Sequence, residues 1–156
     1  MANSVPFEVE RSHLEIGNRR GYSYRFIFEG DGPEGNATVL FDPVKYYDDS
    51  NTIMSERFRE LGLQPDQTVA HLNEFYPNGM GIPDTSPLMG HGVGTAALEL
   101  IVSDAKERGA RVMHVFSTGR PGMVTFMEKR GFEVYSPKPR KDGTYPKKYR
   151  LASKLL

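Results

Sequence analysis

Hydrophobic and polar residues alternate with a period of two along the N-terminal part of the chain. Residues 7–16 follow this pattern, and residues 22–29 repeat it with the aromatic side chains Tyr22, Tyr24, Phe26 and Phe28. A period of two places successive side chains on opposite faces of a strand, so the two segments predict antiparallel strands joined by the turn cluster at 17–21. A third short strand is expected at 37–41, after a loop rich in Gly, Pro and Asp at 30–35.

Apolar residues at helical spacing mark three later segments. Residues 51–61 carry an apolar stripe and are followed by Gly62, which is typical of the end of a helix. A third helix is expected at 121–130, with a proline in its first turn. The strongest pattern lies at 95–108, where the apolar stripe consists of Ala97, Leu98, Ile101, Val102 and Ala105.

Four further segments, at 68–76, 111–116, 132–135 and 148–151, are expected to be strands. The mostly apolar run at 111–116 is typical of a strand covered on both faces. The order β-β-β-α-β-loop-α-β-α-β-β predicts an α/β (α+β) fold, a mixed sheet with helices packed on it. We expect the strands at 68–76 and 111–116 to be adjacent and parallel, with the helix at 95–108 as their crossover.

The composition predicts a single soluble domain over residues 1–156. A chain of this length buries roughly 70% of its unfolded surface. Lys and Arg total 20 and Asp and Glu total 20, which argues against a general attraction to nucleic acid or membrane. The absence of Cys excludes disulfides and a cysteine nucleophile. The first residues lack a signal-peptide pattern and no apolar run reaches a membrane span, so we expect a cytoplasmic protein.

Charge is nevertheless concentrated near the C-terminus. Residues 138–154 contain seven basic residues and one acid, a local balance of +6 (7 − 1), so the first 137 residues carry −6. Two interpretations stay open for this segment. It is either a solvated terminal hairpin or a patch that attracts a phosphorylated ligand or an acidic partner.

Three glycines alternate just before the helix at 95–108, in the run Gly90-His91-Gly92-Val93-Gly94. Glycines let the backbone approach a ligand closely, and the start of a helix adds unpaired N–H donors. Such a loop suits a pyrophosphate, although a merely flexible loop would look the same. A Walker loop is disfavoured because Thr95-Ala96 follows Gly94, and a dinucleotide loop because Thr95 replaces its third glycine.

The run Met89-Gly90-His91-Gly92-Val93-Gly94, the helix and strand after it, and the later run Phe126-Met127-Glu128-Lys129-Arg130-Gly131-Phe132 resemble the GNAT superfamily of acyl-CoA-dependent N-acyltransferases. The resemblance covers residues 88–135, about a third of the chain. It implies a GNAT-like, mostly antiparallel sheet with flanking helices and one parallel strand pair. It also implies acetyl-CoA (coenzyme A) as cosubstrate and an amine of a small molecule or protein as acceptor.

The same resemblance implies a set of cosubstrate-binding residues and three departures from the family pattern. The binding residues are Met89, Gly90, His91, Gly92, Val93, Gly94, Thr95 and Arg120. Met89 stands where Gln or Arg usually contacts the phosphates, and Arg120 where an Asn often contacts the pantetheine arm. Met127 stands where a Tyr often protonates the leaving thiolate, so the usual catalytic acid is missing.

Acyl transfer from a thioester to an amine needs a base for the amine and a donor for the oxyanion. The resemblance places the acyl group beside the strand at 68–76, where polar residues interrupt an apolar run. Glu74 is our first candidate base and His71 the second, and Tyr135 is a candidate replacement for the missing acid. The alternative is that His71 and Asn73 only hold neighbouring loops and that Glu74 is simply exposed.

The other histidines and the carboxylates point to no metal site. His13 is expected at the surface, His91 in the glycine loop, and His114 as a hydrogen-bonded core residue of its strand. The sequence contains neither an HExxH motif nor clustered carboxylates, so no metal is predicted.

Three functions follow from these patterns. The leading hypothesis is an N-acetyltransferase that uses acetyl-CoA, and the second is a catalytically degenerate GNAT-like module that binds coenzyme A or a macromolecular partner. The third is an adaptor that uses the basic segment at 138–154. Acetyl-CoA binding separates the first two from the third, and release of CoA with an amine panel separates the first from the second. The acceptor, the acyl group and a homodimeric state stay open.

Overall fold

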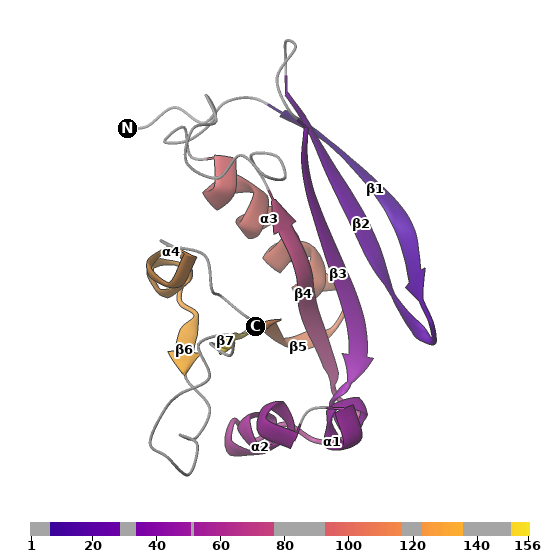
Figure 1. Ribbon diagram of the computed structural model, residues 1–156, viewed down its shortest axis with the longest axis vertical. Helices are drawn as coiled ribbons and strands as arrows, with labels where there is room; N and C mark the ends of the chain where they lie inside the picture. Colours follow the sequence, from indigo (N-terminus) through magenta and orange to yellow (C-terminus); the bar gives the residue numbers. More distant parts are fainter. Residues whose placement is uncertain (1–6, 29–33, 51, 77–92, 117–122, 136–150) are drawn as a thin grey trace, which may run out of the picture.

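The computed structural model describes residues 7–28, 34–50, 52–76, 93–116, 123–135 and 151–156. A sheet of seven strands in the order β1-β2-β3-β4-β5-β7-β6 forms the body of the molecule (Figure 1). The strands are β1 (Phe7–Ile16), β2 (Arg19–Phe28), β3 (Gly35–Pro43), β4 (Thr68–Tyr76), β5 (Ala110–Phe116), β6 (Glu133–Tyr135) and β7 (Leu151–Leu155). The helices are η1 (Val44–Tyr46), α1 (Tyr47–Ser50), α2 (Thr52–Glu60), α3 (Val93–Glu107) and α4 (Met123–Lys129).

The centre of the sheet has the predicted parallel pair. β4 and β5 pair in parallel, whereas every other pair of neighbouring strands is antiparallel. Parallel neighbours need a long connection that returns the chain to the starting edge, and α3 lies in that connection. The predicted fold class is therefore confirmed, as a mixed and mostly antiparallel sheet with one parallel pair.

Successive residues of the central strands pack on opposite faces of the sheet. Ala70 of β4 and Met113 of β5 belong to one apolar cluster, which side chains of α3 and α4 complete. Their neighbours Val69 and Val112 belong to a second cluster, which side chains of α1 and α2 complete. We call these two sides the α3 face and the α2 face. The period-two pattern of the sequence thus decides which residues each helix layer covers.

The largest differences from the predicted strand boundaries lie in β2 and β7. β2 begins at Arg19 rather than at residue 22, because Ile16 pairs with Arg19 across a tight turn in which Gly17 has a φ of 60°. β7 lies at Leu151–Leu155, beyond the predicted strand at 148–151, because these are the residues that pair with β5 and β6. Residues 148–150 lie outside the described part of the chain.

The helices η1 and α1 were not predicted. They follow β3 directly and lead into α2, whose predicted position at 51–61 is nearly correct. Each of the two short helices contributes one buried apolar side chain, Val44 and Tyr47. A single buried residue per element leaves no periodic pattern from which a helix could be predicted.

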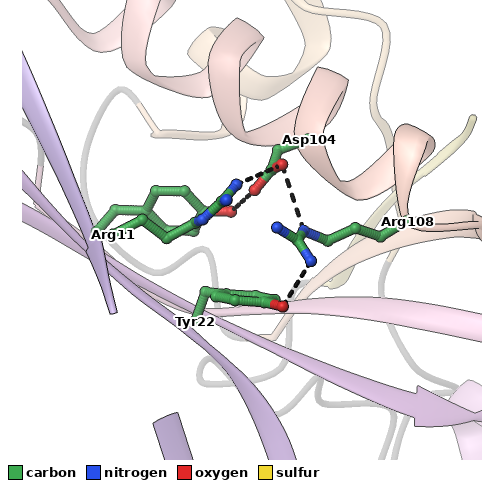
Figure 2. Close-up of polar contacts among 5 residues, drawn as sticks. Arg11, Tyr22, Asp104 and Arg108 are labelled. Carbon is green, nitrogen blue, oxygen red and sulfur yellow. Dashed lines mark hydrogen bonds and ion pairs between the residues drawn. The ribbon is translucent and has the colours of Figure 1, made fainter. Parts of the chain in front are cut away.

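An ionic cluster joins the N-terminal hairpin to α3. The Asp104 carboxylate of α3 accepts hydrogen bonds from Arg11 of β1 (Nη1 to Oδ1, 2.8 Å) and from Arg108 (Nε to Oδ1, 3.3 Å). Figure 2 shows Arg108 also donating to the Tyr22 hydroxyl of β2, at 2.5 Å. The buried Tyr24 hydroxyl donates to the other Asp104 oxygen, and burial raises the pKa of Tyr24. One carboxylate therefore holds side chains of β1, β2 and α3 together.

Candidate functional site

The parallel strands β4 and β5 separate partway along their length. Their pairing runs as far as Leu72 and Val115, although β4 itself continues to Tyr76. On the side that faces β5, the backbone groups of residues 73–75 therefore have no ladder partner in the described part of β5. Backbone N–H groups need a partner, and the carboxyl ends of parallel strands are where ligands bind in open sheets. We call this gap between the two strands the β4–β5 opening.

A β-bulge lies at the start of this opening. Thr38 of β3 pairs with Glu74, whereas the next residue, Val39, pairs with Leu72, so Asn73 is an extra residue in β4. The Asn73 Nδ2 donates to the Thr38 Oγ1 at 3.3 Å. Because of the extra residue, both Asn73 and Glu74 lie opposite Thr38, and both are exposed. Two polar side chains thus stand together beside the opening.

The start of α3 and the end of α4 meet near the end of β4. The Arg130 side chain, just after α4, donates from Nη2 to the Thr95 Oγ1 in the first turn of α3. Its guanidinium also lies over the ring of Phe126, 4.8 Å from the ring centroid. Phe126 stacks in turn on Phe75 of β4, with 6.2 Å between the ring centroids. The first turn of α3, with Gly94 and Thr95, is therefore held at the same end of the sheet as the β4–β5 opening.

A buried polar cluster lies below the opening on the α2 face. Asp42 accepts two hydrogen bonds from Arg19 (Nε 3.0 Å and Nη2 2.7 Å) and one from the Tyr47 hydroxyl (3.0 Å). The Arg19 Nη2 is also 2.9 Å from the Nδ1 of His71. The His71 ring stacks on the ring of His114, with 4.4 Å between the centroids. A guanidinium can only donate, so Nδ1 accepts and a neutral His71 carries its proton on Nε2.

Two neutral histidines make the stability of the fold depend on pH. Burial, followed by the charge of Arg19, lowers the pKa of His71 to about 4, and burial lowers the pKa of His114 well below 6.5. Both groups have a pKa near 6.5 when unfolded, so the unfolded chain binds protons that the folded chain does not. The stabilisation is present above about pH 6.5 and is lost as the pH falls toward the folded pKa.

We expect His71 alone to account for a loss of about 2 kcal/mol between pH 7 and pH 5. Urea unfolding at both pH values measures this loss, and His71→Gln should make the free energy of unfolding less dependent on pH. Equal pH dependence in the parent and the variant would show that His71 is not buried in its neutral form.

The structure places the predicted catalytic residues as follows. Glu74 is exposed at the bulge. His71 is partly buried and bonded to Arg19. Tyr135 lies in β6 and its backbone pairs with Leu151 of β7. His71 and Glu74 are thus brought to one face of β4.

The predicted cosubstrate-binding residues divide into two groups. Val93, Gly94 and Thr95 form the start of α3, which begins two residues earlier than the predicted helix at 95–108. Met89, Gly90, His91, Gly92 and Arg120 lie outside the described residues. Met127, which stands in place of the family's tyrosine, is fully buried in the core of the α3 face.

The prediction for His114 is half correct. It is buried, but neither of its ring nitrogens has a hydrogen-bond partner within the described part of the chain. Arg19, Asp42 and Tyr47 were not predicted as site residues, because these members of the cluster around His71 come from three other elements. Within the described ranges, no helix is long and apolar enough to cross a membrane, and no three acidic, His or Cys side chains are grouped to hold a metal ion.

Known proteins match this chain in fold but not in sequence. No protein-family model matches the chain, and no curated protein matches it in sequence. Solved structures do match. An agmatine N-acetyltransferase aligns with a TM-score of 0.57 and 11% identity, over 86% of this chain and 74% of its own. Arylalkylamine N-acetyltransferase 2 from Aedes aegypti aligns with a TM-score of 0.52 and 14% identity, over 85% and 72%.

A third solved structure, FeeM, is an N-acyl amino acid synthase from uncultured soil microbes. It aligns with a TM-score of 0.51 and 11% identity, over 97% of this chain and 91% of its own. All three are proteins of the GNAT type. At these identities the likeness concerns the fold, and it shows that this chain has a GNAT-like fold.

Proposed function

We propose that the protein is an N-acyltransferase that moves an acyl group, in the simplest case acetyl, from acyl-CoA to an amine. The observation that carries this proposal is the β4–β5 opening, with the start of α3 held at the same end of the sheet. The three similar structures support acyl transfer as the reaction class, and their names give agmatine, arylalkylamines and amino acids as different acceptors. The acceptor here is a small-molecule or protein amine.

The glycine segment before α3 is proposed to hold the coenzyme A pyrophosphate. Gly94 and Thr95 stand in the first turn of α3, where backbone N–H groups lack helical partners and the helix dipole favours an anion. The run from Met89 to Val93 would continue this row of N–H donors, and Arg120 would contact the pantetheine arm. Three glycines among these residues leave room for a phosphate close to the backbone.

Backbone groups can support much of the acyl transfer in this site. The amine nitrogen attacks the thioester carbon, the carbonyl oxygen takes up negative charge, and the carbon–sulfur bond then breaks. N–H groups of residues 73–75 that face β5 have no ladder bond to the described residues of β5 and are suited to donate to this oxygen. The thiolate leaves with a pKa near 8.5 if it resembles Cys, so water can protonate it. The buried Met127 has no proton to give, and Tyr135 stays the candidate for that role.

Glu74 is the better of the two candidate bases. The Nδ1 of His71 is occupied by the Arg19 guanidinium, and its Nε2 already carries a proton. Burial also lowers the pKa of His71 to about 4, which makes it a weak base at neutral pH. The Glu74 carboxylate is exposed at the bulge and accessible to an amine that approaches the β4–β5 opening.

Calorimetric titration with acetyl-CoA, followed by a screen of amines, tests the proposal. We expect acetyl-CoA to bind, and CoA release to rise with a suitable amine. Because the chain has no Cys, a thiol reagent detects released CoA without background from the protein. Gly92→Glu should weaken binding about tenfold or more by adding negative charge before a helix start, whereas Ser103→Glu on the exposed side of α3 should not.

Two results would change the assignment. A titration without heat of binding, together with no CoA release, would exclude acyl-CoA as the donor. Binding without release for any amine would favour the second function, a module that binds coenzyme A without catalysis. The replacement of the family's tyrosine by the buried Met127 is the observation that supports this second function.

A further inference from the structure

His71 lies directly below the β4–β5 opening. It pairs with His114 across the two strands, one rung before the last paired residues, Leu72 and Val115. Its neighbours Ala70 and Leu72 pack in the cluster of the α3 face, so the His71 side chain lies on the opposite, α2 face. Asn73 and Glu74 follow immediately along the strand. The imidazole is therefore placed at the closed end of the gap in which the acyl group is proposed to lie.

The two ring nitrogens of His71 are in different situations. Nδ1 is held by Arg19, as described above. Nε2 has no hydrogen-bond partner among the described residues and, unlike both nitrogens of His114, it is not one of the buried unpartnered atoms. Because His71 is only partly buried, its proton-bearing nitrogen is the ring nitrogen that keeps some exposed surface.

The groups around His71 keep it neutral and in one tautomer. Arg19 comes from β2, and its charge is balanced by Asp42 of β3. The Tyr47 hydroxyl of α1 fixes the second oxygen of Asp42, and the His114 ring of β5 packs flat against the imidazole. A second proton on the imidazole would face the Arg19 guanidinium at 2.9 Å. The ring consequently acts as a hydrogen-bond donor through Nε2 and not as a proton acceptor.

We propose that His71 is a catalytic hydrogen-bond donor, whose Nε2–H binds the carbonyl oxygen of the acyl group as negative charge develops on it. This inference rests on the proposed acyltransferase function and assigns His71 a role other than that of a base. In the step itself the amine nitrogen bonds to the carbonyl carbon and the carbonyl π electrons move to the oxygen. The amine nitrogen loses a proton to Glu74, the carbonyl re-forms, and the carbon–sulfur bond breaks with its electron pair leaving on the thiolate. The His71 proton stays on Nε2 throughout, and Arg19 is a positioning residue that fixes the tautomer.

A pair of substitutions separates a donor from a base. His71→Gln retains an N–H near the position of Nε2, whereas His71→Leu retains none. We expect kcat to fall about 100-fold in His71→Leu and to stay within about tenfold of the parent in His71→Gln, with the Kd for acetyl-CoA unchanged in both. The profile of kcat against pH should lack an inflection from His71 between pH 5 and pH 8. Equal kcat in the parent and His71→Leu, or an inflection near pH 6.5 that His71→Gln removes, would overturn the proposal.

Nitrogen-resolved NMR of the imidazoles tests the same idea without an acceptor. The parent should show His71 as the Nε2–H tautomer down to about pH 5, and saturation with acetyl-CoA should shift the Nε2–H resonance. The double substitution Arg19→Met and Asp42→Asn removes both charges together. It should allow His71 to adopt either neutral tautomer and should raise the pKa of His71. Calorimetric binding of acetyl-CoA with no shift at His71 would overturn this proposal alone. Absence of binding would overturn the proposed function, and with it the role of His71.

Discussion

Replacement of Glu74 by glutamine is expected to lower kcat by one to three factors of ten and to leave the affinity for acetyl-CoA nearly unchanged. Amines are mostly protonated at pH 7, and a positioned base contributes about 10²- to 10⁴-fold to such a step. Glutamine has nearly the same size but cannot accept a proton. The Glu74 side chain is exposed at the β-bulge, so the substitution should not disturb the core. The measurement is kcat against pH for parent and variant with the same amine.

The exposed Glu99 of α3 provides a matched control. Glu99→Gln removes the same charge away from the β4–β5 opening, and should leave kcat within about twofold of the parent. Met127→Leu should also be mild, because a buried apolar residue replaces another of similar volume. An unchanged pH profile in Glu74→Gln would remove Glu74 from the mechanism and leave a bound water as the base.

The second large effect is expected at Gly21, where β2 and β3 approach each other closely. A Cβ at this position would lie 1.8 Å from the Val39 carbonyl oxygen and 2.8 Å from the Leu40 Cα. Both are backbone atoms of the paired strand, so the clash can be relieved only by moving β3 away from β2. We expect Gly21→Ala to lower the free energy of unfolding by about 3 kcal/mol or more. Urea or thermal unfolding measures the loss.

A substitution at Gly17, in the preceding turn, is the control. It tests whether the loss at Gly21 comes from the close contact or from the removal of any glycine. The φ of Gly17 is +60°, and a Cβ there would meet no atom within 4 Å. Gly17→Ala should therefore cost only the strain of a left-handed conformation, about 1 kcal/mol. If the two variants were equally stable, the close approach of β2 and β3 at Gly21 would not exist as described.

The sequence predicted those parts of the fold that depend on local periodicity. The alternation in β1 and β2 and the apolar stripe of α3 each lie within one element, so each could be predicted without its partners. The parallel pairing of β4 and β5 followed from the long helix between them. The cluster around His71 could not be predicted, because Arg19, Asp42 and Tyr47 meet only through the pairing of three strands.

The β-bulge did leave a signal in the sequence. Leu72 and Phe75 both pack in the cluster of the α3 face, although they are three positions apart and a regular strand would separate them by two. Asn73 and Glu74 are the two adjacent polar residues between them. An interruption of this kind in an otherwise alternating strand indicates an extra residue, and here it lies at the edge of the candidate site.

Because Asn73 is an extra residue in β4, a change of chain length there has a different effect from a substitution. Loss of Asn73 would let Glu74 follow Leu72 directly, so that a regular strand would keep Glu74 opposite Thr38 and Phe75 opposite Ala37. Leu72 and Phe75 would then be two positions apart and on the same face, so the contact of Phe75 with Phe126 would persist. A deletion at Asn73 would therefore be inherited as the loss of the bulge and of one polar side chain beside the β4–β5 opening. In alignments of divergent relatives, a gap at Asn73 would then mark the chains that lack the bulge.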